Sequence, residues 1–118
     1  MNDFQNGMLR ITATKDERAV ILRWIGQSDE KNPATLLTPY LNDIVEDVEG
    51  RDVTIEYQQL EFMNSSSVRV ILQFIATLNM RNVNTVVTYD SSSPWQNASF
   101  RVLKTFCAHM PHITIRPK

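Results

Sequence analysis

Apolar and polar residues change their spacing several times along the chain, and each change marks a predicted element. Leu9, Ile11 and Ala13 recur at every second position, which is typical of a half-buried β-strand. The charged residues at 15–18 predict a hairpin turn, and the nearly continuous apolar stretch at 19–25 predicts a central strand buried on both faces. Residues 26–33 are polar and rich in turn-forming types, so we expect a loop there.

A helical period begins at Thr35. Its apolar residues recur in pairs about four positions apart, which predicts an amphipathic helix with one buried face. Pro33 and Pro39 suit the first turn of this helix better than its middle, because proline lacks the N–H group that a helix interior needs. Gly50 is well placed to end it. The apolar positions are Leu36, Leu37, Tyr40, Leu41, Ile44, Val45 and Val48.

The rest of the chain alternates between the same two periods. Residues 53–57 predict a strand, residues 68–78 a helix, and the β-branched residues 83–89 another strand. Ser93 followed by Pro94 predicts the start of a third helix, which ends before a short closing strand at 112–116. The apolar positions of the second helix are Val68, Ile71, Leu72, Ile75 and Leu78, and one face of the third helix comprises Trp95, Ser99, Val102, Leu103, Phe106 and Met110.

Together these elements predict an α/β domain with the order β-β-α-β-α-β-α-β. Each of the last three strands follows a helix, which implies crossover connections and a mixed sheet covered by helices. No internal repeat, low-complexity tract or linker interrupts the pattern. We therefore expect a single domain over residues 1–118.

Composition narrows the classes of protein to which this domain can belong. The chain has 118 residues, 42% of them hydrophobic, which suits one globular domain with a buried core. Its formal net charge of −1 lacks the basic footprint of a nucleic-acid-binding protein. A single cysteine excludes an internal disulfide, and the sequence has neither a signal-peptide pattern nor a run of about 20 apolar residues. We expect a cytoplasmic protein that contacts neither nucleic acid nor membrane.

The most informative segment is residues 60–74, where an apolar strand end, a short polar turn and an apolar helix follow one another. Asn64, Ser65, Ser66 and Ser67 stand where the helix leaves its first N–H groups unpaired, and residues of these types are preferred helix caps. The same position favours an anion, because free N–H groups and the positive end of the helix dipole face it. The segment is therefore a plain helix cap, or a cap that also accepts a phosphoryl group.

This segment resembles the central motif of STAS domains, the fold of sulphate transporters and anti-sigma factor antagonists. The family pattern is an apolar strand, then Phe-hydrophobic-Asp-Ser-Ser-Gly, then an apolar helix. Residues 62–68 match it, with Asn64 at the aspartate and Ser67 at the glycine position. The predicted order of elements also resembles the family over most of the chain. Residues 91–111 resemble a narrower branch of small bacterial, notably cyanobacterial, STAS-like regulators with a Pro-Trp-Gln segment and a helix ending in Met-Pro.

The resemblance implies a non-enzymatic signalling protein that switches partners. By position, Ser65 would be the residue that a kinase of the histidine-kinase-like ATPase type phosphorylates. A metal-dependent serine phosphatase would remove the phosphate. The unphosphorylated form would bind this serine kinase, which in the family often serves as an anti-sigma factor. The partner surface would comprise Asn64, Ser65, Ser66 and Ser67 with Arg69 and Gln73 of the following helix, and the protein would be a monomer or a weak homodimer.

Two departures from the family pattern keep other functions open. Asn64 preserves the shape and capping ability of the aspartate but loses its charge, and Ser67 in place of glycine implies ordinary helical dihedral angles or some strain. The chain could therefore be a constitutive scaffold or subunit that kept the fold and lost the phospho-switch, with Arg69 and Gln73 as ordinary surface. A sensor of a small molecule or nucleotide is a third alternative.

The remaining chemistry-bearing residues point to no enzyme, metal or cofactor. Cys107, His109 and His112 lack the spacing of a zinc site. A hydrolase elbow, a Gly-rich phosphate loop and a metalloprotease motif are all absent from the sequence. Trp95 is either a core residue or a recognition element. The acidic cluster at the end of the first helix is either a solvated face or a docking patch for a basic partner, and it comprises Asp43, Glu46, Asp47 and Glu49.

Overall fold

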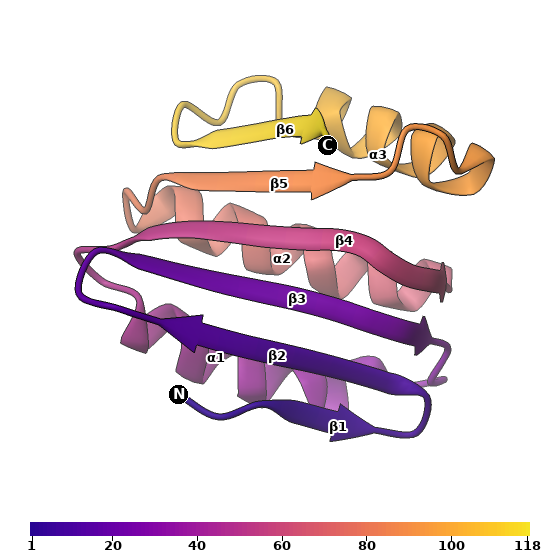
Figure 1. The fold of residues 1–118 in the computed structure, drawn as a ribbon, viewed down its shortest axis with the longest axis horizontal. Helices are drawn as coiled ribbons and strands as arrows, with labels where there is room; N and C mark the ends of the chain where they lie inside the picture. The colour runs from indigo at the N-terminus through magenta and orange to yellow at the C-terminus, as the bar shows by residue number, and fades with distance from the viewer.

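The computed structural model describes residues 1 to 118 and contains one six-stranded sheet. Its strands lie side by side in the order in which they occur along the chain (Figure 1). The first three strands pair antiparallel and the third to the sixth pair parallel, so the sheet is mixed, as predicted. The strands are β1 (Phe4–Asn6), β2 (Leu9–Lys15), β3 (Ala19–Ser28), β4 (Asp52–Met63), β5 (Thr85–Tyr89) and β6 (Ile113–Pro117).

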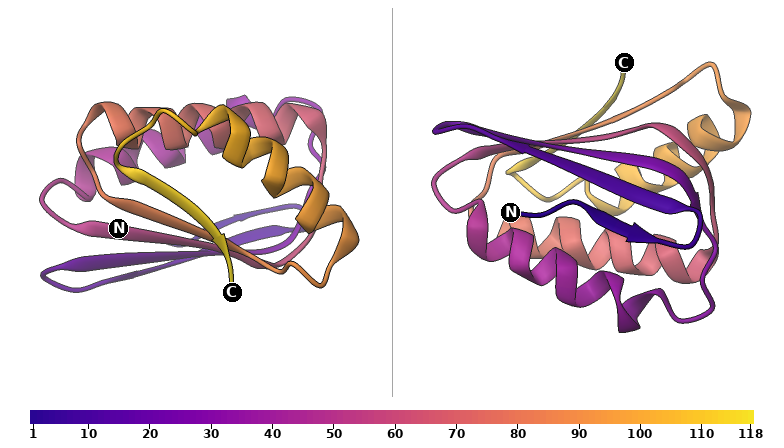
Figure 2. Two further views of the ribbon diagram at one scale, coloured as in Figure 1. Left: turned by 90° about the horizontal axis from the view of Figure 1, so that it is seen from above. Right: turned by 60° about the horizontal axis from the view of Figure 1, so that its bottom comes forward.

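Helices connect the parallel strands, and all of them lie on the same face of the sheet (Figure 2). Crossovers between parallel strands are right-handed in nearly all proteins, so crossovers that step in one direction place their helices on one face. The connections are a 3-10 turn (Pro33–Thr35) followed by α1 (Leu37–Asp47), then α2 (Ser65–Met80) and α3 (Pro94–Phe106). The predicted α/β class is confirmed.

The strands at the start of the chain depart from the predicted order. The chain begins with three strands rather than two, because β1 is only three residues long and too short to produce an alternating pattern. The prediction that a loop begins at residue 26 is wrong, since β3 continues to Ser28, which pairs with Met63. Gly26 allows this extension: its φ is +92°, and a Cβ atom at this position would collide with the carbonyl oxygen of Met8.

The prediction that residues 19–25 are buried on both faces is also wrong. Along β3, Val20, Leu22 and Trp24 are buried against the helices, whereas Ile21 and Ile25 are half-buried on the opposite face. No helix covers that second face, because all three crossovers step in the same direction (Figure 2). This open face of the sheet carries mostly polar side chains from β4 to β6.

The helices bury the faces that their sequences favour, with one exception. In α1 the buried residues include Leu41 and Ile44, and in α2 they include Ile71 and Ile75, as predicted. The prediction of which face of α3 is buried is partly wrong, because Val102 and Phe106 are 58% and 65% exposed. Leu103 is buried as predicted, but the other buried residues of α3 are Gln96 and Phe100, with Cys107 directly after the helix. No helix of the protein is both long enough and apolar enough to cross a membrane.

Candidate functional site

The predicted site lies where β4 ends and α2 begins. Asn64 is the N-cap of α2, with an extended backbone (φ −83°, ψ 171°), and the helix starts at Ser65. The side-chain oxygen Oδ1 of Asn64 accepts a hydrogen bond of 2.9 Å from the backbone N–H of Ser67. The predicted cap is therefore present, and it satisfies one of the N–H groups that a helix leaves unpaired at its start.

The amide group of Asn64 also does what an aspartate could not. Its Nδ2 atom donates a hydrogen bond of 2.8 Å to the carbonyl oxygen of Glu30, in the loop that follows β3. The backbone N–H of Asn64 donates a second hydrogen bond, of 2.9 Å, to the carbonyl oxygen of Ser28. A carboxylate offers only acceptors. The residue that departs from the family pattern thus ties α2 to the end of β3 and to the following loop.

Ser67 occupies the glycine position of the pattern with its side chain completely buried. Its hydroxyl donates to the carbonyl oxygen of Ser28 at 3.0 Å, and the two serine hydroxyls lie 2.6 Å apart. Ser67 is an ordinary residue of α2, without the positive φ that glycine tolerates best. It therefore lies beneath the surface at this helix end rather than on it, and it fixes the helix to β3.

The other five predicted side chains are open to solvent or partly so. Ser65, Ser66, Arg69 and Gln73 are exposed, and Asn64 is half-buried. Ser65, Arg69 and Gln73 follow each other at intervals of four residues, so they form one stripe along α2. The backbone N–H groups of Ser65 and Ser66 make no hydrogen bond within the protein, and Arg69 is in no ion pair. This stripe offers unpaired donors and one free cation to an incoming group.

Two exposed apolar residues lie at the same end of the sheet and were not predicted as part of the site. Phe62 is 48% exposed and pairs across the sheet with Gln27, and Met8 is 63% exposed with its carbonyl oxygen bonded to the N–H of Gln27. Phe62 lies in the matched motif, but as part of the apolar strand end rather than of the predicted partner surface. Exposed apolar side chains are favoured contacts in protein interfaces.

Most of the other residues that the sequence offered as site candidates pack or hydrogen-bond within the fold. The thiol of Cys107 is buried, and this burial raises its pKa. His112 bonds through Nδ1 to the side chain of Asn84 at 3.0 Å, while His109 is exposed. Trp95 packs, partly buried, against the core, which favours the core interpretation.

The acidic cluster at the end of α1 is exposed and only partly paired. Within it, Glu46 forms an ion pair with Arg81 at 2.7 Å. Asp43 and Glu49 have no ion pair, so both remain solvated at the surface.

Sequence reasoning missed Gln96, a buried residue of α3 that hydrogen-bonds to β4. Its Nε2 atom donates to the carbonyl oxygens of Tyr57 and Leu60 at 2.7 and 2.8 Å, and its Oε1 atom accepts from the N–H of Asp90 at 2.8 Å. The pairing of β4 with β5 ends at Glu56, so β5 offers no partner to these two carbonyl groups. Gln96 therefore supports the second half of β4, which leads to Ser65.

The mixed sheet of six strands with its three helices on one face matches the STAS or SpoIIAA-like fold of α/β domains. The family model of the STAS domain matches residues 10–96, and the chain belongs to this family. An anti-sigma factor antagonist from Mycobacterium paratuberculosis is similar, with a TM-score of 0.67, 12% identity, and 90% of this chain and 85% of that chain covered.

Two other solved structures are also similar to this chain in fold, at low sequence identity. The anti-sigma factor antagonist SpoIIAA in its unphosphorylated form has a TM-score of 0.58 and 17% identity, with 90% of this chain and 87% of that chain covered. A protein with a SpoIIAA-like fold from Shewanella loihica PV-4 has a TM-score of 0.53 and 12% identity, with 96% of this chain and 90% of that chain covered. No curated protein sequence matched this chain.

Proposed function

We propose that this chain is a non-enzymatic bacterial signalling protein that acts in the cytoplasm as an anti-sigma factor antagonist. The observation that carries the proposal is the exposed Ser65 side chain, which stands at the phosphoacceptor position of the STAS motif beside unpaired N–H groups. The fold is typically non-enzymatic, and solved structures similar to this one include anti-sigma factor antagonists. The proposed partner is a serine kinase or anti-sigma factor of the histidine-kinase-like ATPase type.

Phosphorylation of Ser65 would act as the switch. A phosphate adds about 1.5 to 2 negative charges at neutral pH and three acceptor oxygens. The free N–H groups of Ser65 and Ser66 and the guanidinium of Arg69, one turn further along, are available to hold it. The phosphorylated protein remains folded, while the partner meets a charged and reshaped helix end. A metal-dependent serine phosphatase would restore the binding form.

A constitutive scaffold is the second candidate, and Asn64 favours it. The bond from its Nδ2 atom to Glu30 fixes the site in one conformation and removes the carboxylate found in the family pattern. A kinase that recognises that carboxylate would bind this chain less well. In this case Ser65 would be a helix residue only, and the partner would remain bound at all times.

The experiment isolates the partner by affinity capture from the native host and identifies it by mass spectrometry. Its affinity is then measured for the wild type, Ser65→Ala, Ser65→Asp and the matched neighbour Ser66→Ala. We expect a serine kinase that binds wild type and both alanine variants alike, with a loss of about tenfold or more for Ser65→Asp. Equal affinity for all four proteins would support the scaffold instead. Intact-mass measurement with and without phosphatase treatment reports whether the host phosphorylates Ser65.

A further inference from the structure

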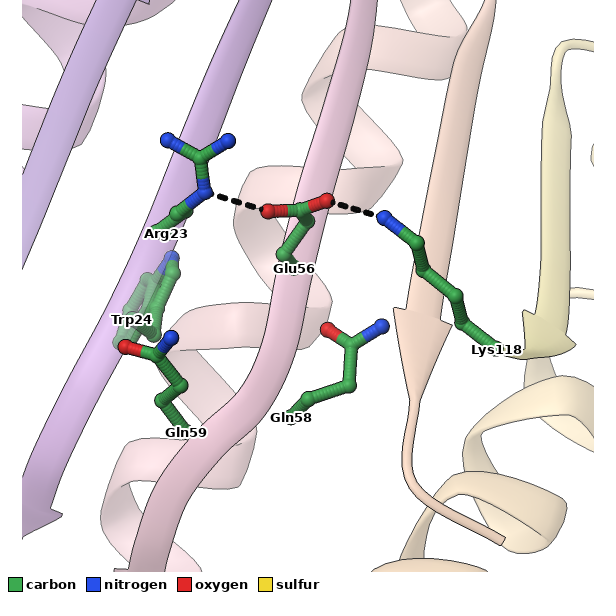
Figure 3. A pocket seen from close by; sticks show the side chains of 6 residues that line it. All are labelled: Arg23, Trp24, Glu56, Gln58, Gln59 and Lys118. Atoms are coloured by element: carbon green, nitrogen blue, oxygen red, sulfur yellow. Dashed lines mark hydrogen bonds and ion pairs between the residues drawn. The ribbon is translucent and has the colours of Figure 1, made fainter.

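The open face of the sheet, opposite the helices and away from α2, has a polar hollow of about 330 Å³. Figure 3 shows the side chains that line it, which come from β3, β4 and the residue that follows β6. A volume of this size is at the lower end of the range for small-molecule sites, about 300–1,000 Å³. The lining residues are Arg23, Trp24, Glu56, Gln58, Gln59 and Lys118.

A β-bulge builds the hollow. Arg23 pairs with Glu56 and Ile25 pairs with Gln59, so Trp24 alone on β3 stands opposite two residues of β4. Bulges redirect side chains and are frequent beside functional sites. Here the irregularity brings two successive glutamines to the same hollow, whereas a regular strand would turn one of them to the opposite face.

The charged side chains of the hollow are held in ion pairs, and positive side chains outnumber negative ones. Glu56 accepts from Nε of Arg23 at 2.7 Å and from Nζ of Lys118 at 2.8 Å (Figure 3). Both carboxylate oxygens are therefore occupied by cations, and the side chain is only 14% exposed. Two positive groups against one negative group leave the hollow with an excess positive charge, which favours an anionic ligand.

Several donors of the hollow have no acceptor. Arg23 uses only its Nε, so its two terminal amino groups are free, and the amide of Gln59 makes no hydrogen bond. The indole N–H of Trp24 is buried without any partner, although the whole residue is inaccessible to solvent. A buried donor without an acceptor costs about 1–3 kcal/mol, so the floor of the hollow carries an unsatisfied polar group.

We propose that this hollow binds a small molecule through a carboxylate group that pairs with the free terminal amino groups of Arg23. The planar guanidinium offers two parallel N–H donors, which match the two oxygens of a carboxylate. A further acceptor atom of the ligand bonds to the amide of Gln59. The site does not share a residue with the stripe around Ser65, so it stands whether or not Ser65 is a switch.

The test is an NMR titration of the ¹⁵N-labelled full chain at constant ionic strength with succinate, its neutral analogue succinamide, and inorganic phosphate. We expect saturable shifts of the Trp24 indole and the glutamine amides with succinate only. Arg23→Gln should weaken succinate binding about tenfold. The control Arg10→Gln changes an exposed arginine of β2 outside the hollow and should change nothing.

Some results would overturn the proposal. Shifts that rise linearly with succinate and persist in Arg23→Gln would show a nonspecific ion effect. Tighter binding of phosphate than of succinate would contradict the carboxylate assignment. The spectrum itself reports whether Arg23→Gln is folded, and Gln59→Leu, which alters an exposed residue without a hydrogen bond, provides a second variant expected to weaken binding.

Discussion

The hydroxyl group of Ser67 donates to the carbonyl oxygen of Ser28 at 3.0 Å and lies 2.6 Å from the Ser28 hydroxyl. This buried pair joins the first turn of α2 to the last residue of β3. We expect Ser67→Ala to lower the free energy of unfolding by about 1–2 kcal/mol, because the Ser28 hydroxyl loses its buried partner. Urea unfolding measures the loss.

A double-mutant cycle tests the pair itself. The double variant with alanine at both positions should be less destabilised than the sum of the two single variants, because no hydroxyl remains unpaired. Strictly additive effects would mean that the hydroxyls do not stabilise each other. Ser66→Ala, one residue earlier and exposed, is the matched control and should leave the unfolding midpoint unchanged.

Asn64→Asp restores the family residue, and we expect it to destabilise the protein. The new carboxylate still caps α2, but it faces the carbonyl oxygen of Glu30, which now accepts from Nδ2 at 2.8 Å. Loss of that bond should lower the free energy of unfolding by about 1 kcal/mol. Asn64→Ser keeps a capping oxygen but lacks the amide nitrogen that reaches Glu30, and it should lose a similar amount. An Asn64→Asp variant as stable as the wild type would show that the bond to Glu30 contributes nothing.

Gln96 should be among the most sensitive polar positions of the fold. Gln96→Met preserves much of the side-chain shape but leaves the carbonyl groups of Tyr57 and Leu60 without their donor. We expect a loss of about 2–4 kcal/mol in the free energy of unfolding, since each buried unpaired group costs about 1–3 kcal/mol. The adjacent Asn97→Ala is the control, because the Asn97 side chain makes no hydrogen bond and is half-buried. Equal unfolding midpoints for the two variants would contradict the structural role of Gln96.

Local signals explain which parts of the site the sequence predicts. The cap of α2 depends on a few consecutive residues, so the types of Asn64 to Ser67 suffice to place the helix start. The buried partner of Ser67 lies 39 positions away in the chain, and no local pattern marks it. Gln96 is harder still, because its partners are backbone groups of Tyr57, Leu60 and Asp90, and no local pattern marks these groups as free to bond with it.

The same reasoning explains the errors in the fold. A continuous apolar run at 19–25 predicts burial on both faces, but the faces that receive helices depend on the direction in which the crossovers step. In α3, Val102 and Phe106 are apolar but exposed, while Gln96 and Phe100 of the neighbouring face are buried. Hydrophobic spacing alone could not choose between these faces, because the buried one contains a glutamine.

The stability of the protein should fall in acid partly through Glu56. Hydrogen bonding to Lys118 and Arg23 holds the pKa of Glu56 below its usual value of 4.5, despite an opposing effect of burial. A lowered pKa in the folded state means that this contribution is present above about pH 4.5 and is lost as the pH falls through the folded-state pKa. Because the side chains of Arg23 and Lys118 are 43% and 62% exposed, solvent screens both ion pairs, and we expect about 0.5–1 kcal/mol.

Glu56→Gln separates this contribution from that of other carboxylates. Between pH 7 and pH 3, the variant should lose less unfolding free energy than the wild type in urea unfolding. Asp16 and Asp90 also have lowered pKa values, the first mainly through the backbone of Arg18 and the second through the Ser92 hydroxyl. Their contributions are common to both proteins and cancel in the difference. Parallel stability curves would contradict the role of Glu56.

Arg69 should stabilise a phosphate on Ser65, and the acidity of that phosphate reports it. In protein carrying phosphoserine at position 65, ³¹P NMR measures the second phosphate pKa, which is about 6 for an unperturbed group. Unpaired N–H groups, the positive end of α2 and the free Arg69 guanidinium all favour the dianion, so we expect a lower value. Arg69→Gln should move the pKa back toward 6, whereas Gln73→Ala, one turn further along the same stripe, should not. An unperturbed phosphate pKa in all three proteins would mean that the helix end does not hold the phosphate, and that a switch would act through the partner alone.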